Sequence, residues 1–461
     1  METEFSDEVA ALLCPPSHAQ IQEYFETLLA ERKCSGLKVK PEGEHGKGVY
    51  SAVDFEENDL VLKDQMLAGA QHYSNKIDCM VCSYCFRFIG SIELQIGRKL
   101  YLQELGISAV DECGPSDGAG CSGSSEKISL PQDTVESLMN GGLKLPYSEN
   151  FPLPVVVPCP GACKEAYYCS KSCAEADWES FHSLLCIGRG SSSSSNTEAL
   201  VKFTKHANET NDIFILASKV ISFIILRYRK LKATQLEQQG KRDSSNGYNS
   251  LNFPLLLEAW KPVSMGFKDR WWDCIDLPED VDSCDEVDFR MQIKDLAFES
   301  LQLLKEAIYD KECAPLFSLD IYGHIIGMFE LNNLDLVVAS PVEDYFLYID
   351  DLPRSQKKEA EKVTKPFLDA LGEDYSISCQ GTAFFPIQSC MNHSCYPNAK
   401  AFKREEDRDG QATIIALRPI LKGEEITISY IDEDLSYEER QAQLADYGFR
   451  CKCPKCIQEQ P

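Results

Sequence analysis

The sequence predicts an α+β fold made of small sheets and separate helical segments, and three observations support this. Short apolar runs between glycine turns in residues 36–71 are typical of short strands. Apolar residues recur at helical spacing over residues 198–230 and again from Phe289 to Ala307. The 21 cysteines include several closely spaced groups, which in a reducing compartment indicate metal binding more often than disulfides.

Length, composition and charge limit the possible functions. The 461 residues suggest about two to four domains, and the 43% hydrophobic content is sufficient for real cores. No run of 18 apolar residues occurs, and the first residues lack the basic and apolar regions of a signal peptide, so we expect no membrane association. A net charge of −27 argues against direct nucleic-acid binding by the chain as a whole and favours a basic partner. The simpler interpretation of this acidity is solubility.

The first seventy residues are predicted to form a helix followed by strands. Residues 5–33 carry apolar side chains at roughly helical spacing, and we expect one helix there that packs on the following domain. Gly46-Lys47-Gly48 precedes an apolar strand, and its glycines would let the backbone approach a ligand closely. An ordinary turn is the alternative. A dinucleotide loop is not indicated, since no strand–loop–helix unit with the required glycine order follows.

Cysteine and histidine pairs between residues 79 and 186 have the spacing of zinc ligands. These pairs are Cys82-x2-Cys85, Cys159-x3-Cys163, Cys169-x3-Cys173 and His182-x3-Cys186. Eight such ligands make two tetrahedral sites. Cys79 precedes Cys82 at the same spacing as Cys85 follows it, so Cys79 and Cys82 are the alternative first pair, although we favour Cys82 with Cys85.

Several polar segments interrupt the predicted elements. Residues 86–158 separate the first ligand pair from the others, and they contain a Gly/Ser-rich stretch, 113–125, that we expect to be a mobile loop. Cys113 and Cys121 in this stretch are interpreted as free thiols. Five consecutive serines mark residues 188–196 as a linker, and the polar residues 240–252 are again typical of a loop.

Three blocks near the end of the sequence carry the clearest functional signal. Residues 388–400 read QSCMNHSCYPNAK, residues 423–430 read GEEITISY, and Gly448-Phe449 leads into Cys451-x-Cys453-x2-Cys456. This order resembles the carboxy-terminal half of a SET domain with its post-SET zinc tail, and residues 46–51 resemble the first SET motif. SET domains are protein lysine methyltransferases that use S-adenosylmethionine. The interleaved cysteine order of residues 82–186 resembles a MYND zinc finger.

A SET domain split by a zinc finger and helices resembles the SET-and-MYND (SMYD) branch and the plant trithorax-related (ATXR) SET proteins. The resemblance implies small β-sheets with a pseudoknot-like core, a MYND-like finger, a helical insert and a zinc-binding post-SET tail. The expected segments are an N-terminal helical part (1–35), the first SET part (36–78), the finger (79–187), a linker (188–197), the helical insert (198–320), the second SET part (321–434) and the post-SET segment (435–461). The sequence ends five residues after Cys456, so we expect the helical-repeat tail of many SMYD enzymes to be missing.

The resemblance implies three structural zinc ions. The first would be held by Cys82, Cys85, Cys169 and Cys173, the second by Cys159, Cys163, His182 and Cys186, and the third by Cys395, Cys451, Cys453 and Cys456. The third group joins the loop that contains Asn392-His393-Ser394-Cys395, called the NHSC loop below, to the tail. The short CxC spacing suits one metal better than an ordinary disulfide.

The resemblance also implies the site residues. Tyr430 stands at the place of the catalytic tyrosine, and the alternative for it is a buried core tyrosine. Contacts to S-adenosylmethionine would come from His45, Lys47, Ser389, Asn392, His393, Tyr430 and Phe449. Asn332 and Asn333 fall where another strand of the family faces the cofactor. The alternative for these residues is ordinary strand or turn structure.

The expected function is S-adenosylmethionine-dependent methylation of protein lysine, with the histone H3 tail as the favoured substrate in chromatin and transcription regulation. The family's frequent sites on that tail are the fourth and thirty-sixth positions, and the plant-type resemblance favours the second. We expect a monomer located in the nucleus, with the cytoplasm as a second compartment. The alternative is a non-catalytic adaptor whose finger recruits transcription-factor partners through proline-containing peptides.

Overall fold

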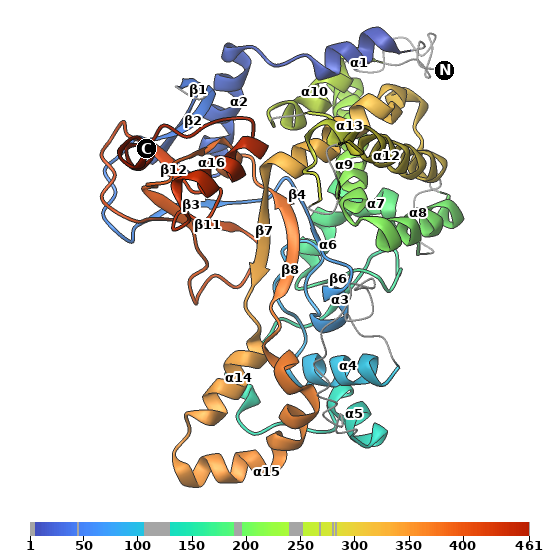
Figure 1. Ribbon diagram of the computed structural model, residues 1–461. Helices are drawn as coiled ribbons and strands as arrows, with labels where there is room; N and C mark the ends of the chain where they lie inside the picture. The colour runs from blue at the N-terminus through green and yellow to red at the C-terminus, as the bar shows by residue number, and fades with distance from the viewer. Residues whose placement is uncertain are drawn as a thin grey trace.

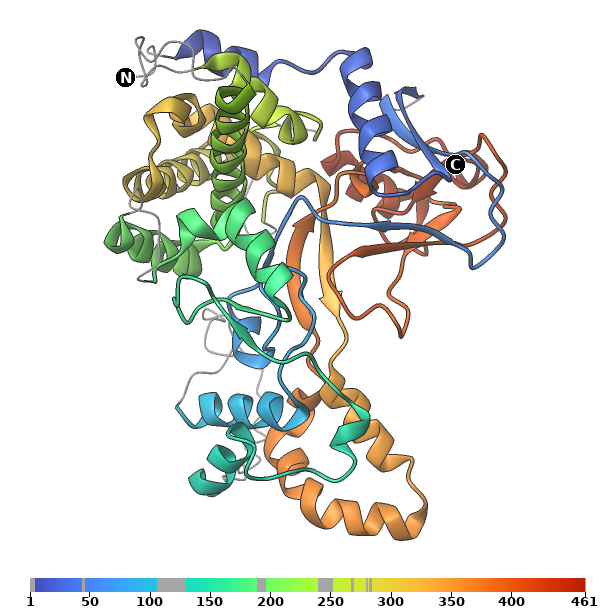
Figure 2. The same cartoon turned by 180° about the vertical axis from the view of Figure 1, so that it is seen from behind.

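The computed structural model describes residues 5–43, 46–105, 130–188, 196–238, 252–266, 269–278, 281 and 284–460. Figure 1 shows three parts around a central sheet. A sheet-rich core with both the early blue strands and the late red segments lies on one side, and a helical body lies on the other. A second, smaller group of helices lies below, and Figure 2 shows the same separation from behind.

Strands from the two ends of the sequence share the sheet-rich core. One sheet has the order β1-β2-β12-β9, formed by β1 (Leu37–Gly43), β2 (Gly46–Ser51), β12 (Glu425–Ile428) and β9 (Asn392–His393). The other has the order β10-β11-β3, formed by β10 (Ala399–Ala401), β11 (Ala412–Ala416) and β3 (Leu60–Asp64). Val49 faces Ile426 across β2 and β12, and both side chains are fully buried. The early and late strands therefore form one folded unit.

A third sheet, the central one in Figure 1, connects this core to the remaining parts. Its order is β4-β8-β7, with β4 (Ala68–Gln71), β8 (Cys379–Phe384) and β7 (Asn333–Val338), all antiparallel. A Cβ at Gly381 would lie 2.3 Å from the carbonyl oxygen of Ala70. Glycine therefore allows the close approach of β8 to β4.

The N-terminal segment forms two helices, so the prediction of one helix over residues 5–33 was wrong. They are α1 (Ser6–Leu13) and α2 (His18–Glu31). Pro15 and Pro16 separate them, because proline cannot supply the backbone donor that a continuing helix needs. Ser17 then starts α2 with a capping box closed by Gln20. Leu12 of α1 packs on the helical body, whereas α2 packs on the sheet-rich core.

The helical body confirms the helical spacing of residues 198–230 and 289–307. It contains α8 (Thr197–Thr210), α9 (Ile213–Gln238), α10 (Phe253–Ser264), α11 (Trp271–Cys274), α12 (Glu286–Ile308), η3 (Lys311–Phe317) and α13 (Leu319–Asn332). Asn211, in extended conformation, ends α8. The buried faces of these helices form the largest apolar cluster, which includes Ile224, Trp260 and Ile325. Residues 189–195 of the predicted linker and 240–251 of the predicted loop lie outside the described residues.

A lower helical lobe was not predicted. It is built from two segments far apart in the sequence: α4 (Ile92–Glu104), α5 (Gln132–Met139) and η1 (Ser148–Asn150) come from the first, and α14 (Pro341–Asp350), α15 (Arg354–Leu371) and η4 (Gly372–Ser376) from the second. Ile96, Val135 and Tyr345 meet in its core. The predicted loop 113–125, with Cys113 and Cys121, lies outside the described residues.

The remaining elements are short and surround the cysteine groups. The finger contains β5 (Val157–Pro158), β6 (Tyr167–Tyr168), α6 (Lys171–Asp177), η2 (Trp178–His182) and α7 (Ser183–Leu185), and α3 (Asn75–Asp78) precedes it. η5 (Gln388–Cys390) precedes β9, and the late segment, residues 435–460, contains α16 (Tyr437–Asp446) and α17 (Pro454–Glu459). Among the described helices, none is long and apolar enough to cross a membrane.

Candidate active site and metal centres

The structure brings the twelve predicted metal ligands together in the three predicted groups of four. Within each group all the ligand atoms lie within 4.8 Å of one another. The sulfur atoms of Cys85 and Cys169 are 3.5 Å apart, and those of Cys159 and Cys186 are 3.8 Å apart. Zinc–sulfur bonds of about 2.3 Å in a tetrahedron place the sulfurs roughly 3.8 Å apart, whereas a disulfide needs about 2.05 Å. The residues therefore fit zinc.

Cys85, and not Cys79, pairs with Cys82. Cys79 lies in a different apolar cluster, where its thiol donates to the carbonyl oxygen of Ile377 at 3.4 Å. Burial raises the pKa of Cys79 to about 12, so its thiol stays protonated. The sulfur atoms of Cys82 and Cys85, in contrast, lie within 4.8 Å of each other and of those of Cys169 and Cys173, as a tetrahedral metal site requires.

Protein purified without chelator should carry three zinc ions per chain, because all three groups have a complete tetrahedral ligand set. The measurement is elemental analysis of the purified protein alongside its protein concentration. One zinc ion or none in catalytically active protein would contradict the assignment.

The third group joins the loop after β9 to the late segment. Cys395 and Cys456 have sulfurs 3.5 Å apart. Two side chains of α16 donate to the Cys456 sulfur, Gln441 at 3.3 Å and Arg440 at 3.9 Å. Because Arg440 is only 1% exposed, its positive charge lies within the cluster and would offset the negative charge of metal-bound thiolates.

A buried carboxylate holds the turn that leads into the NHSC loop. Asp64, at the end of β3, accepts hydrogen bonds from the backbone N–H groups of Ile387 at 2.7 Å and Gln388 at 2.9 Å. Its other oxygen pairs with Arg32, which follows α2. Asp64 is fully buried, and desolvation raises its pKa to about 6 in spite of Arg32. This network links α2 to the start of the loop and was not predicted from the sequence.

Arg32→Met should destabilise the protein more at pH 7.5 than at pH 5. A carboxyl whose pKa is raised by folding contributes its stability below its unfolded pKa, and this contribution is lost as the pH rises through the folded value of about 6. Removing Arg32 raises the pKa of Asp64 further, so the penalty grows toward neutral pH. Leaving such a buried charge unpaired costs about 3 kcal/mol.

The measurement is chemical denaturation of wild type and variant at both pH values. Taking the difference between the two proteins at each pH cancels the pH dependence of the metal sites, which both share. A loss of equal size at pH 5 and pH 7.5 would contradict the role given to Asp64.

Tyr430 lies two residues after β12, next to the NHSC loop. Its hydroxyl donates to the carbonyl oxygen of Met391 at 2.6 Å, and its backbone N–H donates to Nδ1 of His393 at 3.1 Å. Burial raises the pKa of Tyr430, with smaller contributions from Cys390, Tyr447 and Glu425. The hydroxyl therefore stays protonated at neutral pH, and its oxygen keeps lone pairs to accept from another group.

His393 connects this tyrosine to the third metal group. While Nδ1 accepts from Tyr430, Nε2 lies 3.2 Å from the sulfur of Cys395. Burial lowers the pKa of His393 to about 4, so the imidazole is neutral with its proton on Nε2. Both ring nitrogens are used within the protein, and the ring serves as a link between strand and cluster.

Two aromatic rings from the late segment close around the same residues. Phe449 has its ring centre 5.9 Å from that of His393 and 6.5 Å from that of Tyr430. Tyr447 has its ring 5.3 Å from that of Tyr430 and is 42% exposed. Sequence reasoning missed Tyr447, although its position four residues before Cys451 was visible.

The other predicted cofactor residues lie in different surroundings. Ser389 belongs to η5, and its hydroxyl donates to the carbonyl oxygen of Pro386 at 3.2 Å. The carbonyl oxygen of Lys47 accepts from the Asn392 side chain at 3.0 Å, while its ammonium group donates to the carbonyl of Met265. Asn332 ends α13, where its amide donates to the carbonyl oxygen of Met328 at 3.1 Å, and Asn333 begins β7. His45 lies outside the described residues.

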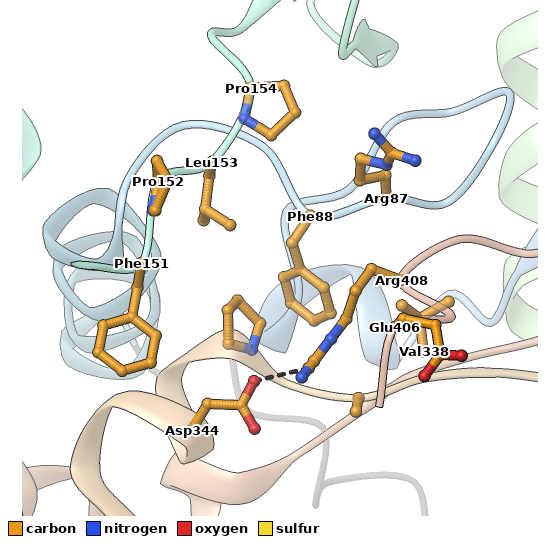
Figure 3. A pocket seen from close by; sticks show the side chains of 12 residues that line it. Arg87, Phe88, Phe151, Pro152, Leu153, Pro154, Val338, Asp344, Glu406 and Arg408 are labelled. Carbon is orange, nitrogen blue, oxygen red and sulfur yellow. Dashed lines mark hydrogen bonds and ion pairs between the residues drawn. The ribbon is translucent and has the colours of Figure 1, made fainter. Parts of the chain in front are cut away.

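A separate cavity of about 780 Å³ lies where the lower lobe, the finger segment and the β10–β11 loop meet (Figure 3). The rings of Phe88 and Phe151 line it, and an ion pair of 2.6 Å joins Asp344 to Arg408 at its edge. None of the predicted catalytic or cofactor residues that the structure describes lines this cavity. It is distinct from the site around Tyr430.

Mixed sheets from both ends of the chain, an NHSC loop beside a tyrosine-ended strand, and an inserted two-metal finger define a SET-domain protein with a MYND finger. Family models agree: the SET domain model matches residues 275–431 and the MYND finger model matches residues 153–186. The strands of residues 37–64 lie outside the SET match, yet they pair with strands inside it.

Whole-chain comparisons place the protein more closely. It is 63% identical to histone-lysine N-methyltransferase ATXR2 of Arabidopsis thaliana over 467 residues, which cover 99% of this chain and 97% of that protein. It is 22% identical to protein-lysine N-trimethyltransferase SMYD5 of Gallus gallus, over 89% of this chain and 83% of that protein. The chain belongs to the SET-and-MYND family of protein-lysine N-methyltransferases.

Proposed function

We propose that this enzyme transfers a methyl group from S-adenosylmethionine to lysine of histone H3 in the nucleus, and that Tyr430 and the NHSC loop form the active site. The observation that supports this most directly is the convergence of three sequence blocks on one place. Tyr430, His393 and Phe449 come from the strand, the loop and the tail, and their ring centres lie 5.4 to 6.5 Å apart.

Bound S-adenosylmethionine supplies a methyl group on a positively charged sulfur. A neutral amine would attack the methyl carbon, so that a C–N bond forms as the C–S bond breaks and S-adenosylhomocysteine leaves. This displacement requires the nucleophile, the methyl carbon and the sulfur in line, so positioning provides most of the acceleration. The hydroxyl of Tyr430 is fixed by its donation to Met391, which leaves its oxygen to orient the lysine amine. Tyr447 and Phe449 supply apolar walls, and burial beside them lowers the pKa of a lysine amine toward the neutral, nucleophilic form.

The residues of the NHSC loop suit the amino-acid part of the cofactor. Both amide hydrogens of Asn392 are taken by Lys47 and Glu425, at 3.0 and 2.7 Å. Its Oδ1 atom has no donor within hydrogen-bond distance among the described residues. Together with the Ser389 hydroxyl and the backbone of Lys47, this oxygen is available to a cationic amino group.

Asn392→Ala should weaken S-adenosylmethionine binding by about 1–3 kcal/mol, because it leaves a buried polar partner unpaired. Calorimetry on the folded variant measures this. The matched control is Asn398→Ala, since the side chain of Asn398 is buried and bonds to Glu424, Glu425 and Thr427. In free-energy terms, Asn398→Ala should reduce the stability of the protein more than it reduces cofactor affinity. Unchanged affinity in the Asn392 variant would place the cofactor elsewhere.

The substrate proposal rests on the similarity to ATXR2 and on charge. The net charge of −27 favours a basic partner, and histone tails are basic. The decisive experiment is radiolabelled methyl transfer to recombinant nucleosomes and to free histones, followed by mass spectrometry of the modified lysine. Cofactor binding without transfer to any histone would exclude this substrate, and absence of cofactor binding would favour an adaptor function.

A further inference from the structure

The side-chain amide of Asn392 is held in one orientation from two sides. A peptide carbonyl can only accept, so the atom 3.0 Å from the Lys47 carbonyl oxygen must be the amide nitrogen. The second hydrogen of this nitrogen points to Oε1 of Glu425 at 2.7 Å. With the nitrogen fixed, the amide oxygen is turned away from both acceptors. Asn392 therefore presents one acceptor and no donor toward the cofactor.

Glu425 is placed for this task by the sheet. It is the first residue of β12, where it pairs with Tyr50 of β2, and two residues later Thr427 pairs with Asn392 of β9. β12 thus lies between the two segments that Glu425 connects. The side chain of Glu425 is half-buried, so solvent does not fully compete for its hydrogen bond to Asn392.

Gly48 provides the space for this carboxylate. A Cβ at residue 48 would lie 2.6 Å from Oε1 of Glu425 and 3.3 Å from the amide nitrogen of Asn392. Any larger residue would displace the carboxylate from Asn392. The second glycine of the Gly46-Lys47-Gly48 turn therefore leaves space for the Glu425 carboxylate, in addition to allowing the backbone to approach a ligand closely.

We propose that Glu425 is a positioning residue for the methyl-transfer reaction: it holds the Asn392 amide so that Oδ1 accepts a hydrogen bond from the ammonium group of the cofactor. This inference rests on the proposed function. A reversed amide would turn its oxygen toward the Lys47 carbonyl and the Glu425 carboxylate, and its NH2 group toward the ammonium. Glu425 thereby favours the one orientation of the Asn392 amide that binds a cation.

The neighbouring acid, Glu424, has other partners and supplies a control. Its carboxylate accepts from Asn398 at 3.1 Å, from Arg418 at 3.0 Å and from the backbone of Leu421 at 3.0 Å. It makes no hydrogen bond to Asn392 among the described residues. Glu424→Gln therefore removes a charge directly before β12 without altering the hydrogen bonds of the Asn392 amide.

The test is calorimetric binding of two ligands, S-adenosylhomocysteine and its analogue without the amino group. Glu425→Leu should lower the affinity for S-adenosylhomocysteine about tenfold, which is the effect of one lost charge-assisted contact. It should leave the affinity for the analogue unchanged. Glu425→Gln keeps an acceptor oxygen, so it should recover most of the affinity. Glu424→Gln should change neither ligand's affinity.

Three results would overturn the proposal. The first is that Glu425→Leu weakens the binding of both ligands equally, which would indicate a general structural role. The second is that Glu425→Leu binds both ligands with normal affinity. The third is that Glu425→Gln fails to recover the affinity for S-adenosylhomocysteine. If Glu425→Leu does not fold, Gly48→Ala displaces the same carboxylate and must give the same ligand-dependent loss. A wild-type protein that binds neither ligand contradicts the proposed function itself and is thereby distinguished from failure of this inference.

Discussion

Tyr430→Phe should reduce turnover by roughly two to three orders of magnitude while cofactor affinity changes little. If the hydroxyl orients the amine and the transferring methyl group, it contributes more in the transition state than in the ground state, and loss of one such contact has about this effect. The ring remains, so its packing against His393 and Phe449 is kept. The loss of the hydrogen bond to Met391 should cost only about 1 kcal/mol of stability.

The matched control is Tyr345→Phe in the lower lobe. Tyr345 is fully buried, and its hydroxyl donates to the carbonyl oxygen of Pro146 at 2.9 Å, the same kind of bond that Tyr430 makes. This variant should lose similar stability and keep a normal rate. Methylation assays and thermal melting on all three proteins separate the two roles. A Tyr430→Phe enzyme that retains most of its rate would remove Tyr430 from the active site.

Cys453→Ser should lower activity roughly 10- to 100-fold and weaken cofactor binding, because it opens the metal group that holds the late segment against the loop. Phe449, Tyr447 and Cys395 all depend on this closure. Cys163→Ser removes a ligand from the finger instead. Both variants should contain two zinc ions in place of three, yet only Cys453→Ser should lose cofactor affinity. Equal losses of affinity in the two variants would contradict a specific role for the third metal.

The metal groups could be predicted because their signal is local. Ligand type and spacing are visible within a few residues, and pairs such as Cys169-x3-Cys173 remain pairs in the structure. The choice between Cys79 and Cys85 could not be made from spacing, since both are equally distant from Cys82. Burial of Cys79 under the central sheet decided it.

Polar networks between distant residues could not be predicted. Asp64 meets Ile387, and Asn392 meets Glu425 and the Lys47 carbonyl, only after strands from both ends of the chain have paired. Periodicity identifies apolar faces and gives no partner for a single buried acid. The lower lobe was missed for a related reason, because its core combines helices from two separate insertions. The break between α1 and α2 was visible in Pro15 and Pro16 and should have been predicted.

Because the first strands pair with the last ones, the sheet-rich core can fold only after nearly the whole chain has been synthesised. Val49 and its partner Ile426 are roughly 380 residues apart, which at 5–20 residues per second corresponds to roughly 20 to 75 seconds of translation. All eight finger ligands have been made by Cys186, so the nascent chain can acquire two metal ions during this interval. Cys395 has to wait for Cys456. The two finger sites can therefore be filled well before the third one, whose last ligand, Cys456, is made roughly 270 residues after Cys186.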